Sequence, residues 1–218
     1  MSPPYARFDK LDEGKQKAIL DAAVGEFVAH GYELASLNQV IEAAGISKGS
    51  FYYYFEDKLD LFVTVLEGLG ALEDYVKRAA ILESESAEAF WQGCRRMVEL
   101  GMEAAMVRPE IVGLGEAFSG LSQGVLESAR MRDFIEAQVT WLVQVLSHGQ
   151  EVGAVRRDLP MEVAVELWMS LDRVFSRWGV AQLTHGEGSM ESKLESGEVR
   201  AVWEVSLDAF QRLFEPEK

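Results

Sequence analysis

The chain contains a single cysteine, Cys94, among its 218 residues. One thiol cannot form an intrachain disulfide, and zinc sites built from cysteine pairs are excluded for the same reason. Long apolar runs are also lacking, because the uncharged stretch at residues 137–147 is far shorter than the roughly 20 apolar residues that span a membrane. The opening residues 1–7 have no apolar segment typical of a secretory signal. These absences predict a cytoplasmic protein that makes no membrane contact.

Basic residues are scarce as well. The chain has 21 lysines and arginines against 36 aspartates and glutamates, which gives a formal net charge of −15 at pH 7. This balance argues against a protein that coats nucleic acid or an anionic membrane through bulk charge. Any DNA contact must therefore depend on a few local cations.

The chain has only five prolines and few of the alternating patterns that are typical of strands. Its long stretches instead repeat apolar residues with the 3.6-residue period of amphipathic helices, which predicts an all-α fold. Gly31, Gly45 and Gly153 are expected to end three of the helices. Helices are predicted over residues 13–30, 36–44, 47–55, 58–81, 84 or 86 to 108, 109–118, 121–152, 161–183 and 197–214.

Residues 36–55 have the arrangement of a helix-turn-helix, in which a glycine turn joins a support helix to a recognition helix. Ser36 and Ser47 are placed to cap the two helices with their side chains. In the second helix, Phe51 and Phe55 lie on one side, where they can anchor the helix to the core. The neighbouring Tyr52 is expected to be buried with them.

The other side of the predicted recognition helix carries groups suited to DNA. Lys48 lies at the helix start, Gly49 lets the backbone approach a duplex, and Ser50 can donate to a phosphate or a base edge. The hydroxyl groups of Tyr53 and Tyr54 can donate to phosphate oxygens. A further lysine opens the next helix, where its charge and the free N–H groups of that helix can share a phosphate. The predicted DNA-binding set is Ser36, Ser47, Lys48, Gly49, Ser50, Tyr53, Tyr54 and Lys58.

The segment from Ser36 to Phe55, together with the following Lys58 and Leu61-Phe62, resembles the signature of TetR-type (TetR/AcrR-like) transcriptional regulators. The glycine turn, the Ser-Lys-Gly-Ser run, the aromatic run and the lysine agree in order and spacing. The resemblance is strong over residues 14–62, although Ile41 stands where many members carry alanine. It implies a homodimeric, all-helical regulator, usually a repressor, that a small ligand releases from operator DNA. By the same resemblance, residues 47–50, 53, 54 and 58 match positions that commonly contact the operator.

The sequence therefore predicts a three-helix DNA-binding domain over residues 1–56 and a larger helical domain over residues 57–218 for ligand binding and dimerisation. The first 58 residues have a net charge of −3 and the remainder −12, so the DNA-facing region is less acidic but not basic. Further phosphate contacts from the N-terminal arm are an open alternative, because acidic residues interleave with its cations. Those cations are Arg7, Lys10, Lys15 and Lys17.

The larger region is rich in bulky aromatic and methionine side chains, which fill cores and also line apolar cavities between helices. Because this region is acidic and shows no buried basic cluster, its ligand is expected to be a small, largely apolar molecule that is uncharged or cationic. The candidate ligand-binding residues are Trp91, Met102, Met106, Phe118, Phe134, Trp141, Trp168, Phe175 and Trp178.

Apolar stripes on the last two predicted helices suggest a dimer interface, in which the helices pair with their symmetry mates as a four-helix bundle. The candidate interface residues are Val163, Leu167, Leu171, Val174, Val202, Val205, Ala209 and Leu213.

No residue set suited to catalysis is visible. The run from His185 to Glu187 lacks the partner cysteines of zinc deaminases, and no histidine pair has the spacing of a metal site. We therefore expect no enzymatic activity, no cofactor and no bound metal. The main alternative is a helical interaction protein that kept the shape of the motif and lost DNA binding through its acidity. The intact Lys48 and Gly49 count against it, and a small helical enzyme has no residues to support it.

Overall fold

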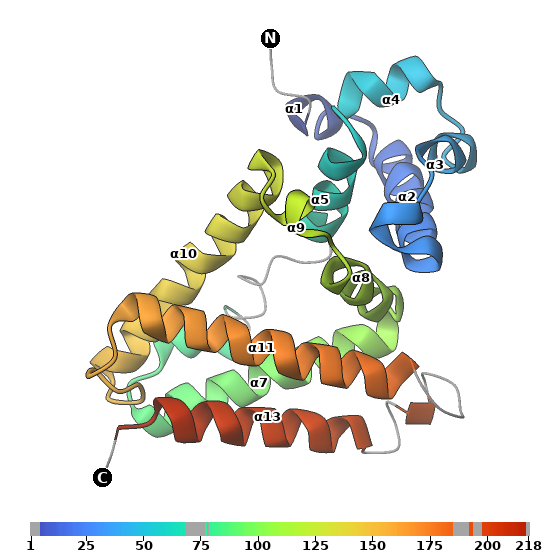
Figure 1. Ribbon diagram of the computed structural model, residues 1–218. Coiled ribbons are helices and arrows are strands. Elements are labelled where there is room, and N and C mark those ends of the chain that lie inside the picture. The colour runs from blue at the N-terminus through green and yellow to red at the C-terminus, as the bar shows by residue number, and fades with distance from the viewer. Residues whose placement is uncertain (1–4, 69–76, 78, 185–191, 194–197, 217–218) are drawn as a thin grey trace. The chain divides into compact units, whose positions relative to one another are not determined.

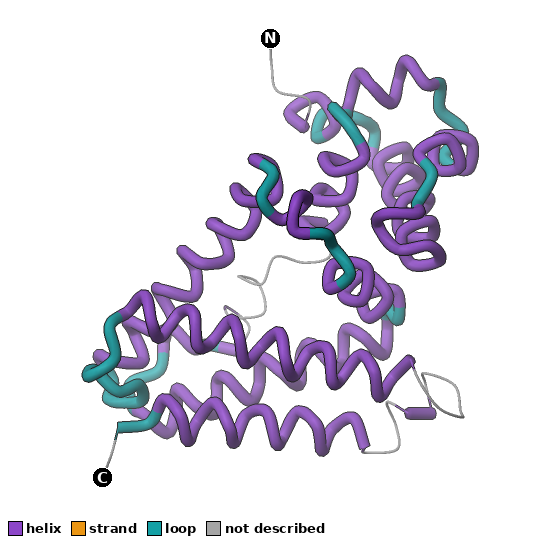
Figure 2. Tube along the Cα trace, viewed as in Figure 1, coloured by secondary structure: helices purple, strands orange, loops and turns teal. Residues whose placement is uncertain are grey.

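A computed structural model of the protein describes residues 5–68, 77, 79–184, 192–193 and 198–216. Within these residues every regular element is a helix and none is a strand, as Figure 2 shows. The predicted all-α fold is confirmed. No helix in the described part of the chain has both the length and the apolar character that crossing a membrane requires.

The helices follow one another along the chain as Figure 1 shows. Their bounds are α1 Tyr5–Phe8, α2 Glu13–Leu34, α3 Leu37–Ala43, α4 Lys48–Tyr54, α5 Lys58–Gly68, the 3₁₀ helix η1 Ile81–Glu83, α7 Ala87–Val107, α8 Glu110–Ser119, α9 Gln123–Leu126, α10 Ala129–Glu151, α11 Met161–Thr184 and α13 Glu198–Phe214.

The chain divides into two compact units. The first contains Met1–Leu69 and Gly113–Ile135, and the second contains Gly70–Val112 and Glu136–Lys218. The boundary between the two units therefore does not lie at residue 56, because Leu61 and Phe62 of α5 belong to the same core as α2 and α4. A DNA-binding role that is confined to residues 1–56 stays a prediction.

The core of the first unit is built largely from aromatic rings. Phe27 of α2 meets Phe62 of α5 edge to face, with ring centroids 4.8 Å apart. Phe51 and Phe55 of α4 are fully buried in the same cluster. Helix α4 is thereby fixed to the helices that support it.

The core of the second unit lies among α7, α10, α11 and α13. Helices α11 and α13 run side by side (Figure 1). Trp168 of α11 packs on Phe210 and Phe214 of α13, with ring centroids 4.5 and 5.2 Å apart. The backbone N–H of Arg156 donates to the carbonyl of Phe214 at 2.7 Å, which ties the end of α13 to the loop before α11.

The three glycines that were expected to end helices all have the left-handed backbone that glycine adopts without strain. Their φ angles are +67° at Gly31, +65° at Gly45 and +73° at Gly153. After Gly45, the N–H of Ile46 donates to the carbonyl of Ile41 at 3.2 Å, as in a Schellman motif. Helix α2 continues for one short turn beyond the break at Gly31.

Two predicted helices differ from the observed ones. Residues 121–152 do not form one helix, because α9 ends at Leu126 and α10 begins at Ala129. The hydroxyl of Ser128 donates to the carbonyl of Val125 at 2.6 Å, a local bond that competes with helix continuation. In the predicted helix 58–81, the described part is helical only to Gly68, and residues 69–76 and 78 lie outside the described residues.

Candidate DNA-binding surface

The two helices of the predicted motif begin differently. At α4, Ser47 caps the helix as expected, because its hydroxyl accepts from the N–H of Ser50 at 3.0 Å. At α3, the side chain of Ser36 makes no capping bond, so that prediction is wrong. The N–H of Ser36 instead donates to the carboxylate of Glu26 on α2 at 2.8 Å, and this bond holds the start of α3 against α2.

Helix α4 buries one side and exposes the other. Phe51 and Phe55 are fully buried, as the helical spacing predicts. Tyr52 is 51% exposed, so its expected burial is wrong. Successive residues of a helix are separated by about 100°, which turns Tyr52 away from the core that holds Phe51. Its ring keeps only an edge contact with Phe51, at 5.2 Å between centroids.

The exposed side of α4 carries most of the predicted DNA-binding set. Lys48 and Gly49 are exposed, and Tyr53 is 54% exposed. The hydroxyl of Ser50 is half-buried and bonds to that of Ser47 at 2.9 Å. A Cβ atom at residue 49 would meet only the Ser47 hydroxyl at 3.8 Å, an ordinary contact. The protein's own packing therefore does not require a glycine there.

Helix α1 packs against α4, an arrangement that the sequence reasoning missed. Phe8 is buried and its ring lies 5.0 Å from that of Phe55 and 6.4 Å from that of Tyr54. Tyr54 is half-buried by this contact and offers less of its surface than Tyr53. The guanidinium of Arg7 lies 4.8 Å from the centroid of the Tyr53 ring. The apolar pair Phe8 and Leu11, three residues apart, was the available sequence signal.

Lys58 is engaged within the protein. Its ammonium donates to the carbonyls of Glu33 at 2.9 Å and Ala35 at 3.2 Å, and it lies 4.8 Å from the centroid of the Tyr32 ring. Lys58 thus holds the corner between α2 and α3. An ammonium has three N–H groups, so a phosphate contact through the third stays a prediction. Burial, with added repulsion from Asp57 and Glu33, raises the pKa of Tyr32 to about 12.

Carboxylates occupy the N-terminus of α5, where the sequence suggested a phosphate. Asp57 accepts from the N–H of Asp60 at 2.9 Å, and Asp60 accepts from the N–H of Glu56 at 3.1 Å. Arg130 of α10 donates to the buried Asp60 at 3.2 Å and makes a two-pronged bond with Glu67 at 3.0 and 2.9 Å. A phosphate at this helix start would have to compete with these acidic groups.

The candidate ligand-binding residues are divided between the two units. Phe118 and Phe134 pack against the core of the first unit, with their rings 6.4 Å apart. The other seven lie in the second unit, where Trp91 and Trp168 stack at 6.5 Å. The indole N–H groups of Trp91 and Trp141 are buried and have no hydrogen-bond partner within the described residues.

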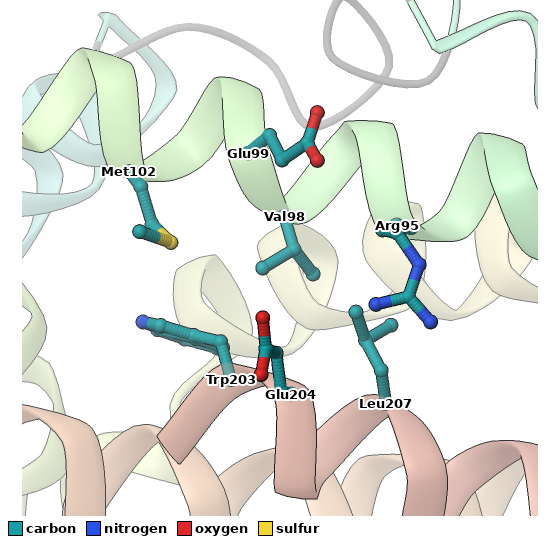
Figure 3. A pocket seen from close by; sticks show the side chains of 7 residues that line it. All are labelled: Arg95, Val98, Glu99, Met102, Trp203, Glu204 and Leu207. Carbon is teal, nitrogen blue, oxygen red and sulfur yellow. The ribbon is translucent and has the colours of Figure 1, made fainter. Parts of the chain in front are cut away.

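A small hollow of about 80 Å³ lies between α7 and α13 in the second unit. Figure 3 shows the Trp203 indole extending toward Met102, and Arg95 lying beside Leu207. Val98, Glu99 and Glu204 complete the lining. Met102 is the one member of the candidate ligand set that lines this hollow, so the hollow and the predicted pocket largely differ.

The candidate dimer residues fall into three groups that differ in exposure. Val163, Val174 and Val205 expose large apolar side chains. Leu167, Leu171 and Leu213 are half-buried against the core of the second unit, and Ala209 is also half-buried. Val202 is buried within the protomer itself. Val163, Val174 and Val205 therefore expose more of their side chains than the other five candidates do.

Metal-binding and catalytic groupings can be assessed only in the described part of the chain. There, no three histidine, cysteine, aspartate or glutamate side chains gather as a metal site would require. Residues 185–187 lie outside the described residues. Burial raises the pKa of the Cys94 thiol to about 12, which disfavours the reactive thiolate.

We expect Lys58→Met to lower the free energy of unfolding by about 1–3 kcal/mol, because two backbone carbonyls lose a charged donor. Lys48→Met is the matched control, since Lys48 is exposed and its side chain makes no hydrogen bond or ion pair that the structure shows. Thermal unfolding of the DNA-free variants measures both. Equal melting temperatures for the two variants would contradict the structural role of Lys58.

Comparison with known proteins agrees with the helix-turn-helix in the first unit. Residues 19–65 match the family described as bacterial regulatory proteins, tetR family. The HTH-type transcriptional regulator SrpR of Pseudomonas putida is 26% identical over 164 residues, which cover 74% of this chain and 73% of that protein. The HTH-type transcriptional repressor KstR2 of Rhodococcus jostii (strain RHA1) is 26% identical over 187 residues, which cover 82% of this chain and 86% of that protein.

A solved structure has the same fold. It is the transcriptional regulator FadR from Bacillus subtilis in complex with stearoyl-CoA, with a TM-score of 0.64 and 15% sequence identity. The match covers 88% of this chain and 97% of that one. At this identity the likeness concerns the fold alone.

Proposed function

We propose that the chain is a TetR-type transcriptional regulator, to which residues 19–65 and two regulators of 26% identity are similar, and that it is a homodimeric repressor that a small, largely apolar ligand releases from operator DNA. Its DNA contacts come from α4, its dimer contacts from α11 and α13, and its ligand contacts from the second unit. The presentation of α4 carries the proposal.

The exposed side of α4 suits the major groove. Phe51 and Phe55 anchor the helix, while Lys48, Gly49 and Tyr53 remain accessible on the other side. A recognition helix reads base edges with its N-terminal residues, and Ser50 lies in the first turn of α4. Lys48 supplies a positive charge at the same end. These features favour DNA binding over the alternative of a helical protein that lost it.

Dimerisation would cover the apolar groups exposed on α11 and α13. Val174 is 55% exposed and Val205 is 51% exposed, and Val163 is exposed on the same helix as Val174. A homodimer brings two recognition helices to half-sites about one helical turn apart. One operator can then be bound by both copies of α4.

The ligand would bind in the second unit, where the unpartnered indoles lie. A buried N–H without a partner costs free energy, so an acceptor atom on an apolar ligand would stabilise the complex. The unoccupied donors of Trp91 and Trp141 therefore favour an apolar molecule with an uncharged oxygen. The stearoyl-CoA bound by the FadR neighbour also has a long apolar chain, although its head group is anionic.

DNA binding is tested by selecting bound duplexes from random DNA and repeating the measurement with two variants. We expect Ser50→Ala to change the ranking of preferred sequences, because Ser50 lies in the first turn of the recognition helix and can donate to a base edge. We expect Lys58→Ala to weaken binding to all sequences alike. Circular dichroism at the assay temperature shows that both variants are folded. Failure of the folded wild-type protein to select any sequence would contradict the proposal.

Dimerisation is tested by placing a charge among the apolar side chains that α11 and α13 expose. Val174→Glu and Val205→Glu are expected to yield monomers in sedimentation at micromolar concentration, and DNA affinity should fall with them. Val107→Glu is the control, because Val107 is 81% exposed at the end of α7 and lies outside the proposed interface. A monomeric wild-type protein, or a dimer unaffected by both changes, would overturn this assignment.

The ligand class is tested with molecules of one chain length and different head groups. Dodecanol, below its solubility limit, is expected to shift the tryptophan emission and to release operator DNA, whereas dodecanoyl-CoA, a multiple anion, is not. The ligand must favour the released form by a few kcal/mol to change occupancy. Trp141→Phe should weaken the response by removing a donor, and Trp203→Phe, which removes a tryptophan outside the candidate set, serves as the control. Release by the anion alone would contradict the predicted pocket.

A further inference from the structure

Helix α1 gives the chain a fixed platform beside the recognition helix. Phe8 is 4% exposed and packs on Phe55, the C-cap residue that follows α4. The side-chain amide of Gln16 on α2 donates to the carbonyls of Phe8 at 2.9 Å and Leu11 at 3.0 Å. The backbone that carries Arg7 is therefore attached both to α2 and to α4.

Arg7 touches Tyr53 in two ways. Its Nη1 donates to the carbonyl of Tyr53 at 3.3 Å, and its guanidinium carbon lies 4.8 Å from the centroid of the Tyr53 ring. The structure records one further ring contact of Tyr53, an edge contact with Tyr54 at 5.2 Å. An exposed tyrosine ring with so few neighbours depends on each of them for its orientation.

We propose that Arg7 is a positioning residue for DNA binding: its guanidinium holds the Tyr53 ring so that the phenol hydroxyl meets the DNA backbone. The proposal rests on the proposed function, in which the exposed side of α4 binds an operator. Arg7 acts through Tyr53 and adds no separate ion pair with a phosphate. The sequence did not distinguish Arg7 from the other three cations of the N-terminal arm. The structure does, because the guanidinium of Arg7 contacts Tyr53.

The guanidinium suits this task better than an ammonium does. It is planar and carries five N–H groups in a fixed fork, so it can lie against a ring while an N–H donates to a carbonyl in a fixed orientation, whereas a lysine ammonium is a compact charge with no plane to set against a ring. The other arm cations lack this contact. Lys17 pairs with Asp21, and Lys10 and Lys15 are exposed with no side-chain partner that the structure shows. Lys10 therefore provides a matched control for the loss of one arm charge.

The experiment measures operator affinity for Arg7→Lys and Arg7→Gln, each in the wild-type and in a Tyr53→Leu background. An exposed contact between a cation and a ring corresponds to roughly a two- to fivefold change in affinity. We expect Arg7→Gln to weaken binding by about that factor when Tyr53 is present and by none when it is absent. Arg7→Lys should also weaken binding while leaving the salt dependence unchanged, because the charge is kept.

Lys10→Gln separates this role from a simple effect of charge. If Arg7 binds a phosphate directly, Arg7→Gln will weaken binding equally in both backgrounds and will reduce the salt slope by about 0.9. An effect of Arg7→Gln no larger than that of Lys10→Gln would also overturn the proposal. If Arg7→Lys binds the operator as tightly as the wild-type protein does, a positive charge at residue 7 suffices and the positioning role is rejected.

A second measurement uses the protein without DNA. Thermal unfolding of Arg7→Gln, Tyr53→Leu and the double variant should show coupling, since each change removes the same contact. If the wild-type protein selects no DNA and coupling is present, the proposed function fails and the role of Arg7 in DNA binding fails with it, while the contact itself stands. If DNA binding holds and coupling is absent, only the inference about Arg7 is overturned.

Discussion

The burial of Phe51 and Phe55 is the constraint on which the exposed side of α4, the proposed DNA-binding surface, depends. With both rings inside the core of the first unit, the rotation of α4 is fixed, and the helical repeat then exposes Lys48, Gly49 and Tyr53 together. Two buried phenylalanine side chains contribute roughly 1.5–3 kcal/mol each relative to exposure. The exposed face of α4 is thus a consequence of its buried face, and any change that rotates the helix would displace Lys48, Gly49 and Tyr53 at once.

The acidity of the chain is a second constraint, because it limits electrostatic attraction to DNA. In a chain with a net charge of −15, attraction to DNA must come from cations close to the phosphates, since charges separated by more than about 8 Å are largely screened at physiological salt. The structure uses two of the nearby cations internally: Lys58 holds the carbonyls after α2, and Arg7 lies on Tyr53. Lys48 is left as an exposed cation at the start of α4. Binding by such a surface depends on orientation more than on total charge.

The sequence predicted the parts of the fold that local rules determine. Gly31, Gly45 and Gly153 were placed correctly because a left-handed backbone favours glycine, and Phe51 and Phe55 because spacing alone shows that they share a face. The contacts of Lys58 with α2 and of Phe8 with α4 could not be read from spacing, because they join residues far apart in the chain. The break between α9 and α10 coincides with a local bond from the Ser128 hydroxyl to the carbonyl of Val125, which periodicity does not register.

The first unit is completed by residues far along the chain. The buried carboxylate of Asp60 fixes the turn between α4 and α5, and its charge is balanced by Arg130 from the start of α10. Removing one partner of a buried pair costs about 3–5 kcal/mol, so α4 and α5 need α10 for more than surface packing. Helix α10 is continuous from Ala129 to Glu151, and its residues from Glu136 onward belong to the second unit. Arg130 at the start of α10 thus belongs to the first unit, and a change that displaces this end of α10 acts directly on the turn that follows α4.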